Sequence, residues 1–77
     1  MPVTSAQVRM ARAALNWTVR NLAEASGLHR NTITNIEVGR YAGDPKTLAI
    51  LEKILTKAGV EFTNGDQPGV RLRKSRK

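Results

Sequence analysis

The sequence predicts an all-α domain of four helices, followed by a short C-terminal β-hairpin and a basic tail. Apolar residues recur at helical spacing in four segments, and residues that commonly cap helices precede those segments. After Gly59 the spacing changes to strict alternation, which is typical of strands. A chain of 77 residues forms one small core. We therefore expect a helical domain over residues 1–58, with the hairpin and tail over residues 59–77.

The first helix is predicted to begin just after Thr4, because Thr4 and Gln7 have the spacing of a capping box. Val3 and Val8 have the spacing of a hydrophobic staple around that cap. The second helix repeats this arrangement, with Thr18 as the cap and with Trp17 and Leu22 as the staple, and Gly27 ends it.

The third helix is predicted to start at His29, a weaker N-cap than Ser, Thr, Asp or Asn, and to end at Gly39. The fourth helix opens with Asp44 as cap and Pro45 in the first helical position. Strands are expected at Val60–Thr63 and Val70–Arg73, joined by a loop that contains a turn at Asn64-Gly65. A two-stranded hairpin is marginal alone, so it needs a surface or a partner strand.

Composition limits the possible functions. The net charge is +7, and residues 1–40, 41–66 and 67–77 carry +3, −1 and +5, a distribution that suits a polyanionic partner. There is no cysteine and one histidine, so we expect no disulfide, no metal site and no cofactor. No stretch is long and apolar enough to cross a membrane, and the N-terminus does not resemble a signal peptide, so a cytoplasmic protein is expected.

The most informative segment runs from residue 18 to residue 39. Two short helices meet there across a tight turn that contains Gly27. The exposed face of the second of them presents Arg30, Asn31, Thr34 and Asn35. Arginine pairs with guanine and asparagine with adenine in the major groove of DNA. A helix-turn-helix over residues 19–38 that reads double-stranded DNA is therefore predicted.

A spaced set of residues extends this pattern from Val8 to Leu55: Arg9, Arg12, Leu15, Trp17, Leu22-Ala23, Gly27, Ile33, Ile36, Glu37, Gly39 and Thr47-Leu48. In these positions the sequence resembles the Cro/C1-type (XRE-like) helix-turn-helix family of phage and bacterial repressors. The resemblance implies a compact lambda-repressor-like DNA-binding domain. It also implies that residues 30–38 form the recognition helix and that residues 19–26 cross the DNA backbone.

The same resemblance implies roles for individual residues. The base-facing positions are His29, Arg30, Asn31, Thr34 and Asn35. The positions that meet phosphates are Thr18, Arg20 and Arg40, and Tyr41 lies close by, where a phosphate contact and plain packing are equally compatible with the sequence. Arg12 and Glu37 match a structural ion pair. The chain departs from the family at Val19, where glutamine is usual, and at His29, where serine or threonine is usual.

Three functions remain open at this point. The first is a transcriptional regulator, a repressor or an activator, that acts as a homodimer. Its dimer surface could be the fourth helix, the hairpin or both, and we predict that Val60–Thr63 and Val70–Arg73 contribute to pairing. The second is an antitoxin that binds a partner toxin and autoregulates its operon. The third is an RNA-associated module. The sequence favours it least, because such a module uses exposed aromatic side chains to stack on bases and this chain has few aromatic residues. The sequence shows no nucleophile and base at a spacing that would bring them together in a catalytic site, so an enzyme is not predicted. The tail residues Arg71, Arg73, Lys74, Arg76 and Lys77 are expected to be mobile and either attract phosphates or only solubilise the chain.

Overall fold

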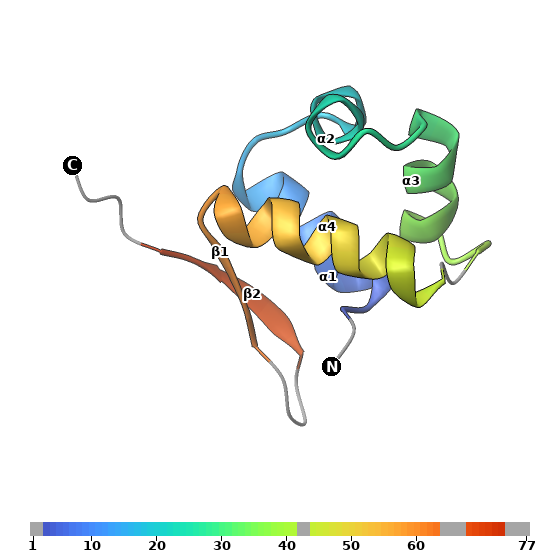
Figure 1. Ribbon diagram of the computed structural model, residues 1–77. Coiled ribbons are helices and arrows are strands. Elements are labelled where there is room, and N and C mark those ends of the chain that lie inside the picture. Colours follow the sequence, from blue (N-terminus) through green and yellow to red (C-terminus); the bar gives the residue numbers. More distant parts are fainter. Residues whose placement is uncertain (1–2, 42–43, 64–67, 74–77) are drawn as a thin grey trace.

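The computed structural model describes residues 3–41, 44–63 and 68–73 (Figure 1). Four helices precede two strands: α1 (Ser5–Ala14), α2 (Val19–Ser26), α3 (Arg30–Glu37), α4 (Pro45–Lys57), β1 (Val60–Thr63) and β2 (Gly69–Leu72). In Figure 1, α2 and α3 lie on one side of α1 and α4, and the hairpin leaves the other side. The four predicted helices and the antiparallel hairpin are confirmed, and β2 begins and ends one residue earlier than predicted.

Side-chain caps explain where these helices begin. The Thr4 hydroxyl accepts a hydrogen bond from the Gln7 backbone N–H, and the Gln7 amide oxygen accepts one from the Thr4 N–H. Thr18 and Asn21 form the same reciprocal pair at the start of α2, although the sequence prediction had assigned the cap to Thr18 alone. Each box satisfies backbone donors that the helix itself leaves without partners.

The fourth helix begins at a carboxylate. Asp44 Oδ1 accepts the Thr47 N–H at 2.8 Å, and Pro45 occupies the first helical position. The hydrogen bond to Thr47 lowers the pKa of the Asp44 carboxyl from its ordinary value, because it favours the ionised form. The cap of α4 is therefore charged at neutral pH.

One apolar core joins the helices to the hairpin. Its fully buried members are Val8, Ala11, Leu22, Ile33, Ile36, Leu51, Leu55 and Val60, with Val3 nearly so. Val60 is the first residue of β1, so the hairpin and the helices share this core. Trp17 is half-buried and packs against the core, which is the packing role that its staple position predicts.

The hairpin packs on the helices through one of its faces. Val60 pairs with Leu72, and Phe62 pairs with Val70, so the four side chains share a face. Three of the four, all except Leu72, belong to or pack against the core, while Leu72 is 48% exposed. On the opposite face Glu61 and Arg71 form an exposed ion pair at 2.7 Å. The surface that an isolated hairpin needs is thus supplied by α1 and α4.

A single buried amide fastens the hairpin to α1. Gln7 is 1% exposed, and its Nε2 donates to the carbonyl oxygens of Thr63 at 2.9 Å and Gly69 at 3.0 Å. With the bond that its Oε1 accepts from Thr4, this side chain has a protein partner for both of its polar atoms. Gln7 therefore caps α1 and holds the strand ends together.

Two residues expected in a mobile tail have fixed positions. Arg71 lies in β2 and pairs with Glu61, and Arg73 donates from Nη2 to the Thr56 carbonyl at 2.9 Å, near the end of α4. The prediction of mobility is wrong for these two residues, because strand pairing extends over them as far as Arg73 N–H, which donates to the Gly59 carbonyl. The predicted turn at Asn64-Gly65 and the tail residues Lys74, Arg76 and Lys77 lie outside the described residues.

Candidate nucleic-acid interface

The outer face of α3 is the centre of the candidate interface. Ile33 and Ile36 are fully buried, which fixes the rotation of the helix about its axis. Arg30, Asn31 and Thr34 are consequently exposed, while Asn35 is half-buried at the edge of that face. A short helix with this outer face fits the width of a major groove and carries both hydrogen-bond donors and acceptors.

The turn between α2 and α3 depends on Gly27. Its φ is +78°, in the left-handed region that favours glycine, and its N–H donates to the Ala23 carbonyl. A Cβ built at Gly27 would meet no atom within 4 Å, so the constraint is the backbone conformation and not the available space. The Ser26 hydroxyl then accepts the Leu28 N–H at 3.2 Å. These contacts set the angle between the two helices.

The start of α3 is capped by His29. Its Nδ1 accepts the Asn31 backbone N–H at 3.0 Å, and its carbonyl accepts the N–H groups of Thr32 and Ile33. His29 therefore caps α3 as predicted from the sequence, through the hydrogen bond that its Nδ1 accepts from Asn31. The rest of the ring is exposed beside the first turn of the helix.

The end of α3 is tied to α1 by charge. Glu37 is 4% exposed, and its two carboxylate oxygens accept from Arg12 Nε at 2.9 Å and Arg12 Nη2 at 3.0 Å. Arg12 Nη1 also donates to the Trp17 carbonyl. The hydrogen bond to Glu37 raises the pKa of the Arg12 guanidinium, so this guanidinium stays charged at neutral pH. This bidentate contact holds the C-terminal end of α3 against α1.

Arg9 adds a second contact between α1 and the same end of α3. Its Nη1 donates to the Glu37 backbone carbonyl, one of the acceptors that the helix leaves without an internal partner. The sequence analysis named Arg9 as part of the family pattern but assigned it no contact. The signal that was available is its position three residues before Arg12, which puts both side chains on one face of α1.

The residues expected at phosphates lie at two separate places. Thr18 and Arg20 are at the start of α2, where Arg20 Nε lies 3.6 Å from Glu24 Oε2 with both side chains well exposed. Arg40 and Tyr41 follow α3. Arg40 Nη1 donates to the Asn35 Oδ1 at 3.3 Å, and the Tyr41 side chain is 42% exposed. The exposed outer face of α3 lies between these two groups in sequence.

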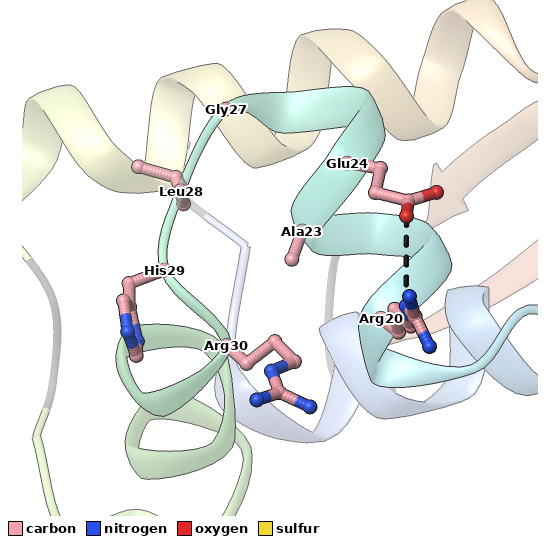
Figure 2. A pocket seen from close by; sticks show the side chains of 7 residues that line it. All are labelled: Arg20, Ala23, Glu24, Gly27, Leu28, His29 and Arg30. Atoms are coloured by element: carbon pink, nitrogen blue, oxygen red, sulfur yellow. Dashed lines mark ion pairs between the residues drawn. The ribbon is translucent and has the colours of Figure 1, made fainter.

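An open hollow separates α2 from the start of α3 (Figure 2). Its lining is Arg20, Ala23, Glu24, Gly27, Leu28, His29 and Arg30. In Figure 2, Arg30 leaves the first turn of α3 on the side of Arg20, and His29 leaves it on the other side. The hollow is open to solvent, and two arginines and one glutamate line it, so the charge along it is net positive.

Other kinds of site are not found in the described part of the chain. No three His, Cys, Asp or Glu residues there lie close enough together to hold a metal ion. No described helix reaches the length and apolar content that crossing a membrane requires. In residues 3–41, 44–63 and 68–73 every buried side-chain nitrogen and oxygen has a hydrogen-bond partner.

Comparison with known proteins agrees with this geometry. A family model described as helix-turn-helix, of the Cro/C1 type, matches residues 8–62, which include all four helices apart from the first turn of α1 and most of β1. A search of curated proteins found no match.

Proposed function

This chain belongs to the Cro/C1-type helix-turn-helix family of DNA-binding transcription regulators, and from that premise we propose that it is a repressor that binds one double-stranded DNA sequence as a homodimer. The observation that carries the proposal is the anchoring of α3. Its inner face is buried, its end is held by Arg12, and its outer face presents Arg30, Asn31 and Thr34. A helix held in this way keeps its side chains in register with base edges.

In this proposal the exposed face of α3 reads bases and the flanking groups meet phosphates. Arg30, Asn31 and Thr34 read base edges, together with His29 and Asn35 at the margins of the face. Thr18, Arg20, Arg40 and Tyr41 contact the backbone. Because phosphate contacts carry no sequence information, these two groups predict different behaviour when mutated.

Selection of duplexes from a random library, followed by affinity measurements on single-base variants of the selected site, tests this division. Arg30→Ala is expected to cost about 1–3 kcal/mol at one defined base position. Arg40→Ala is the matched control, because it removes the same charge, and it is expected to weaken all sequences alike and to flatten the salt dependence by about one unit. An unchanged ranking of sites for Arg30→Ala would contradict the assignment.

A homodimer is proposed because one helix of eight residues offers few base contacts. Two copies on half-sites about one DNA turn apart double that number. We propose that the hairpin contributes to pairing, because Leu72 leaves apolar surface exposed next to the core. Leu72→Glu should lower the dimer fraction in analytical ultracentrifugation, whereas Lys53→Glu, at an exposed position of α4, should not. A wild-type monomer at high micromolar concentration in low and in high salt would contradict this.

Repression is proposed because a protein bound at a promoter excludes other proteins from it. A reporter gene placed behind the selected site should fall in output when the protein is expressed, and Arg30→Ala should restore it. We place the protein in the cytoplasm, where its DNA would be. Copurification with a stoichiometric protein encoded beside it would instead favour the antitoxin alternative.

A further inference from the structure

The register of the hairpin shows which backbone groups of β2 point away from β1. The Arg73 N–H donates to the Gly59 carbonyl at 2.7 Å, so these two residues form a hydrogen-bonded pair. In an antiparallel ladder such pairs alternate with pairs whose backbone groups point outward. Val60 and Leu72 form the next pair of the register. The backbone N–H and C=O groups of Leu72, and two residues earlier those of Val70, therefore point away from β1.

These groups form an open strand edge. In the part of the chain that the structure describes, the sheet has two strands, and no hydrogen bond is made to the backbone groups of Val70 or Leu72. Arg71, Leu72 and Arg73 are exposed, whereas every residue of β1 is buried or half-buried. The more accessible edge of the hairpin is therefore that of β2. A row of unpaired strand groups is a template on which another strand can pair.

The side chains of β2 indicate which kind of strand fits this edge. Arg71 and Arg73 alternate with Val70 and Leu72, so basic side chains share one face and apolar side chains share the other. On its paired side β2 meets β1, where Glu61 lies opposite Arg71 and apolar residues flank Glu61. Cross-strand pairs of opposite charge stabilise a sheet. A strand with an acidic residue between two apolar residues would match the open edge in the same way.

A second copy of β2 does not match this edge. In symmetric antiparallel pairing centred on Arg71, two copies of Arg71 lie opposite each other, and pairing centred on Leu72 sets Arg71 opposite Arg73. Like charges in these positions destabilise a sheet. Pairing centred on Val70 sets Leu72 opposite Pro68, which has no N–H to donate. The homodimer proposed above uses the exposed side chain of Leu72 and not this edge.

We infer that the outer edge of β2 is a docking site for an extended segment of another protein, in which an acidic residue stands between two apolar residues. The segment adds to the hairpin as a third strand. The backbone groups of Val70 and Leu72 supply the hydrogen bonds, and Arg71 supplies the preference for an acidic residue. The hairpin and α3 lie on opposite sides of α1 and α4, so the site is separate from the proposed DNA interface (Figure 1).

A pair of substitutions at Leu72 tests the backbone contact. Leu72→Pro removes the outward N–H and leaves the bonds between the strands in place, because this N–H does not point at β1. Leu72→Thr is the matched control, since it removes the same apolar side chain but keeps the N–H. The probe is a synthetic peptide with one glutamate between two valines, titrated into the labelled full-length chain. The wild type is expected to show its largest amide shifts over Val70–Arg73, and Leu72→Pro to bind about tenfold more weakly than Leu72→Thr.

A charge exchange tests the acidic preference, and it does so without a change in the backbone. Glu61→Arg combined with Arg71→Glu keeps the cross-strand ion pair and reverses the sign of the charge at the edge. The wild type is expected to prefer the glutamate peptide over a peptide with lysine in its place. The exchanged protein is expected to show the reverse preference.

Four results would overturn the inference. The first is an absence of binding to the glutamate peptide by the wild type, and the second is equal binding of the glutamate and lysine peptides. The third is equal affinity of Leu72→Pro and Leu72→Thr. The fourth is assembly of the chain alone beyond a dimer in ultracentrifugation that Leu72→Pro abolishes, since the occupant would then be a second copy. None of these results concerns binding of a selected duplex, so this failure and that of the proposed function are distinguishable.

Discussion

Helix α3 and the C-terminal hairpin are each anchored to α1 by a buried polar side chain, but the two anchoring contacts differ in kind. The end of α3 is held by Glu37, a carboxylate whose partner is the Arg12 guanidinium. The hairpin is held by Gln7, a neutral amide that donates to two strand carbonyls. A charged pair thus holds the helix that we propose to face DNA, whereas neutral hydrogen bonds hold the hairpin against the helices.

The largest loss of stability is expected when the Arg12–Glu37 ion pair is removed. Glu37→Gln retains the shape of the side chain but leaves Arg12 without a counter-ion in a largely buried place. We expect a loss of about 3 kcal/mol in the free energy of unfolding, at the lower end for such pairs because the Arg12 side chain is 24% exposed. Urea denaturation measures it.

Glu24→Gln is the matched control for that substitution. Its pair with Arg20 is exposed, so the same change of chemistry should cost about 0.5 kcal/mol or less. Equal losses for the two variants would mean that burial of the Arg12–Glu37 pair contributes nothing to stability. They would contradict the special role of this ion pair in holding α3.

A smaller loss of stability is expected when the hydrogen bonds of the Gln7 amide are removed. Gln7→Leu fills similar space but removes the donor to Thr63 and Gly69 and the acceptor for Thr4. A loss of about 1–3 kcal/mol is expected, because these buried groups lose partners. Hydrogen exchange should show faster exchange of the amides of β1 and β2, with α2 and α3 less affected. Thr4→Ser, which keeps the cap, should leave the exchange pattern unchanged.

The contacts that anchor α3 and those that anchor the hairpin were not equally predictable from the sequence. The Arg12–Glu37 pair was implied by the family resemblance, and the helix starts followed from their capping residues. Gln7 was predicted as a capping residue, but its bonds to Thr63 and Gly69 span 56 and 62 residues, and no local pattern carries such contacts. The start of β2 was placed one residue late because Gly69 has no side chain that alternation can count.

The cap of α4 gives an effect that depends on pH. The pKa of Asp44 is lowered in the folded protein, mainly by the Thr47 N–H, so its charge contributes fully above the ordinary aspartate pKa of about 4. The contribution is lost as pH falls through the lower, folded-state pKa. Asp44→Asn keeps a cap without the charge, so the stability difference between wild type and variant should shrink over this range. A constant difference in unfolding measurements from pH 6 to pH 3 would contradict the assignment.

The smallest effect is expected on the outer face of the hairpin. Arg71→Ala removes an ion pair with Glu61 in which the arginine side chain is 73% exposed. Such pairs contribute about 0.2–1 kcal/mol, and salt weakens them. Thermal unfolding in low and high salt should show a small loss that vanishes in high salt. A loss as large as that of Gln7→Leu would mean that the outer face, and not the buried amide, holds the hairpin.

We propose that the packing of α3 on α1 presents the outer face of α3 to a DNA duplex. Titration of the labelled protein with its selected duplex, followed by amide chemical shifts, tests this directly. The largest shifts are expected at Arg30, Asn31 and Thr34 and at the start of α2, with saturation at two chains per duplex. Shifts confined to residues after Gly69, with α3 unperturbed, would contradict it.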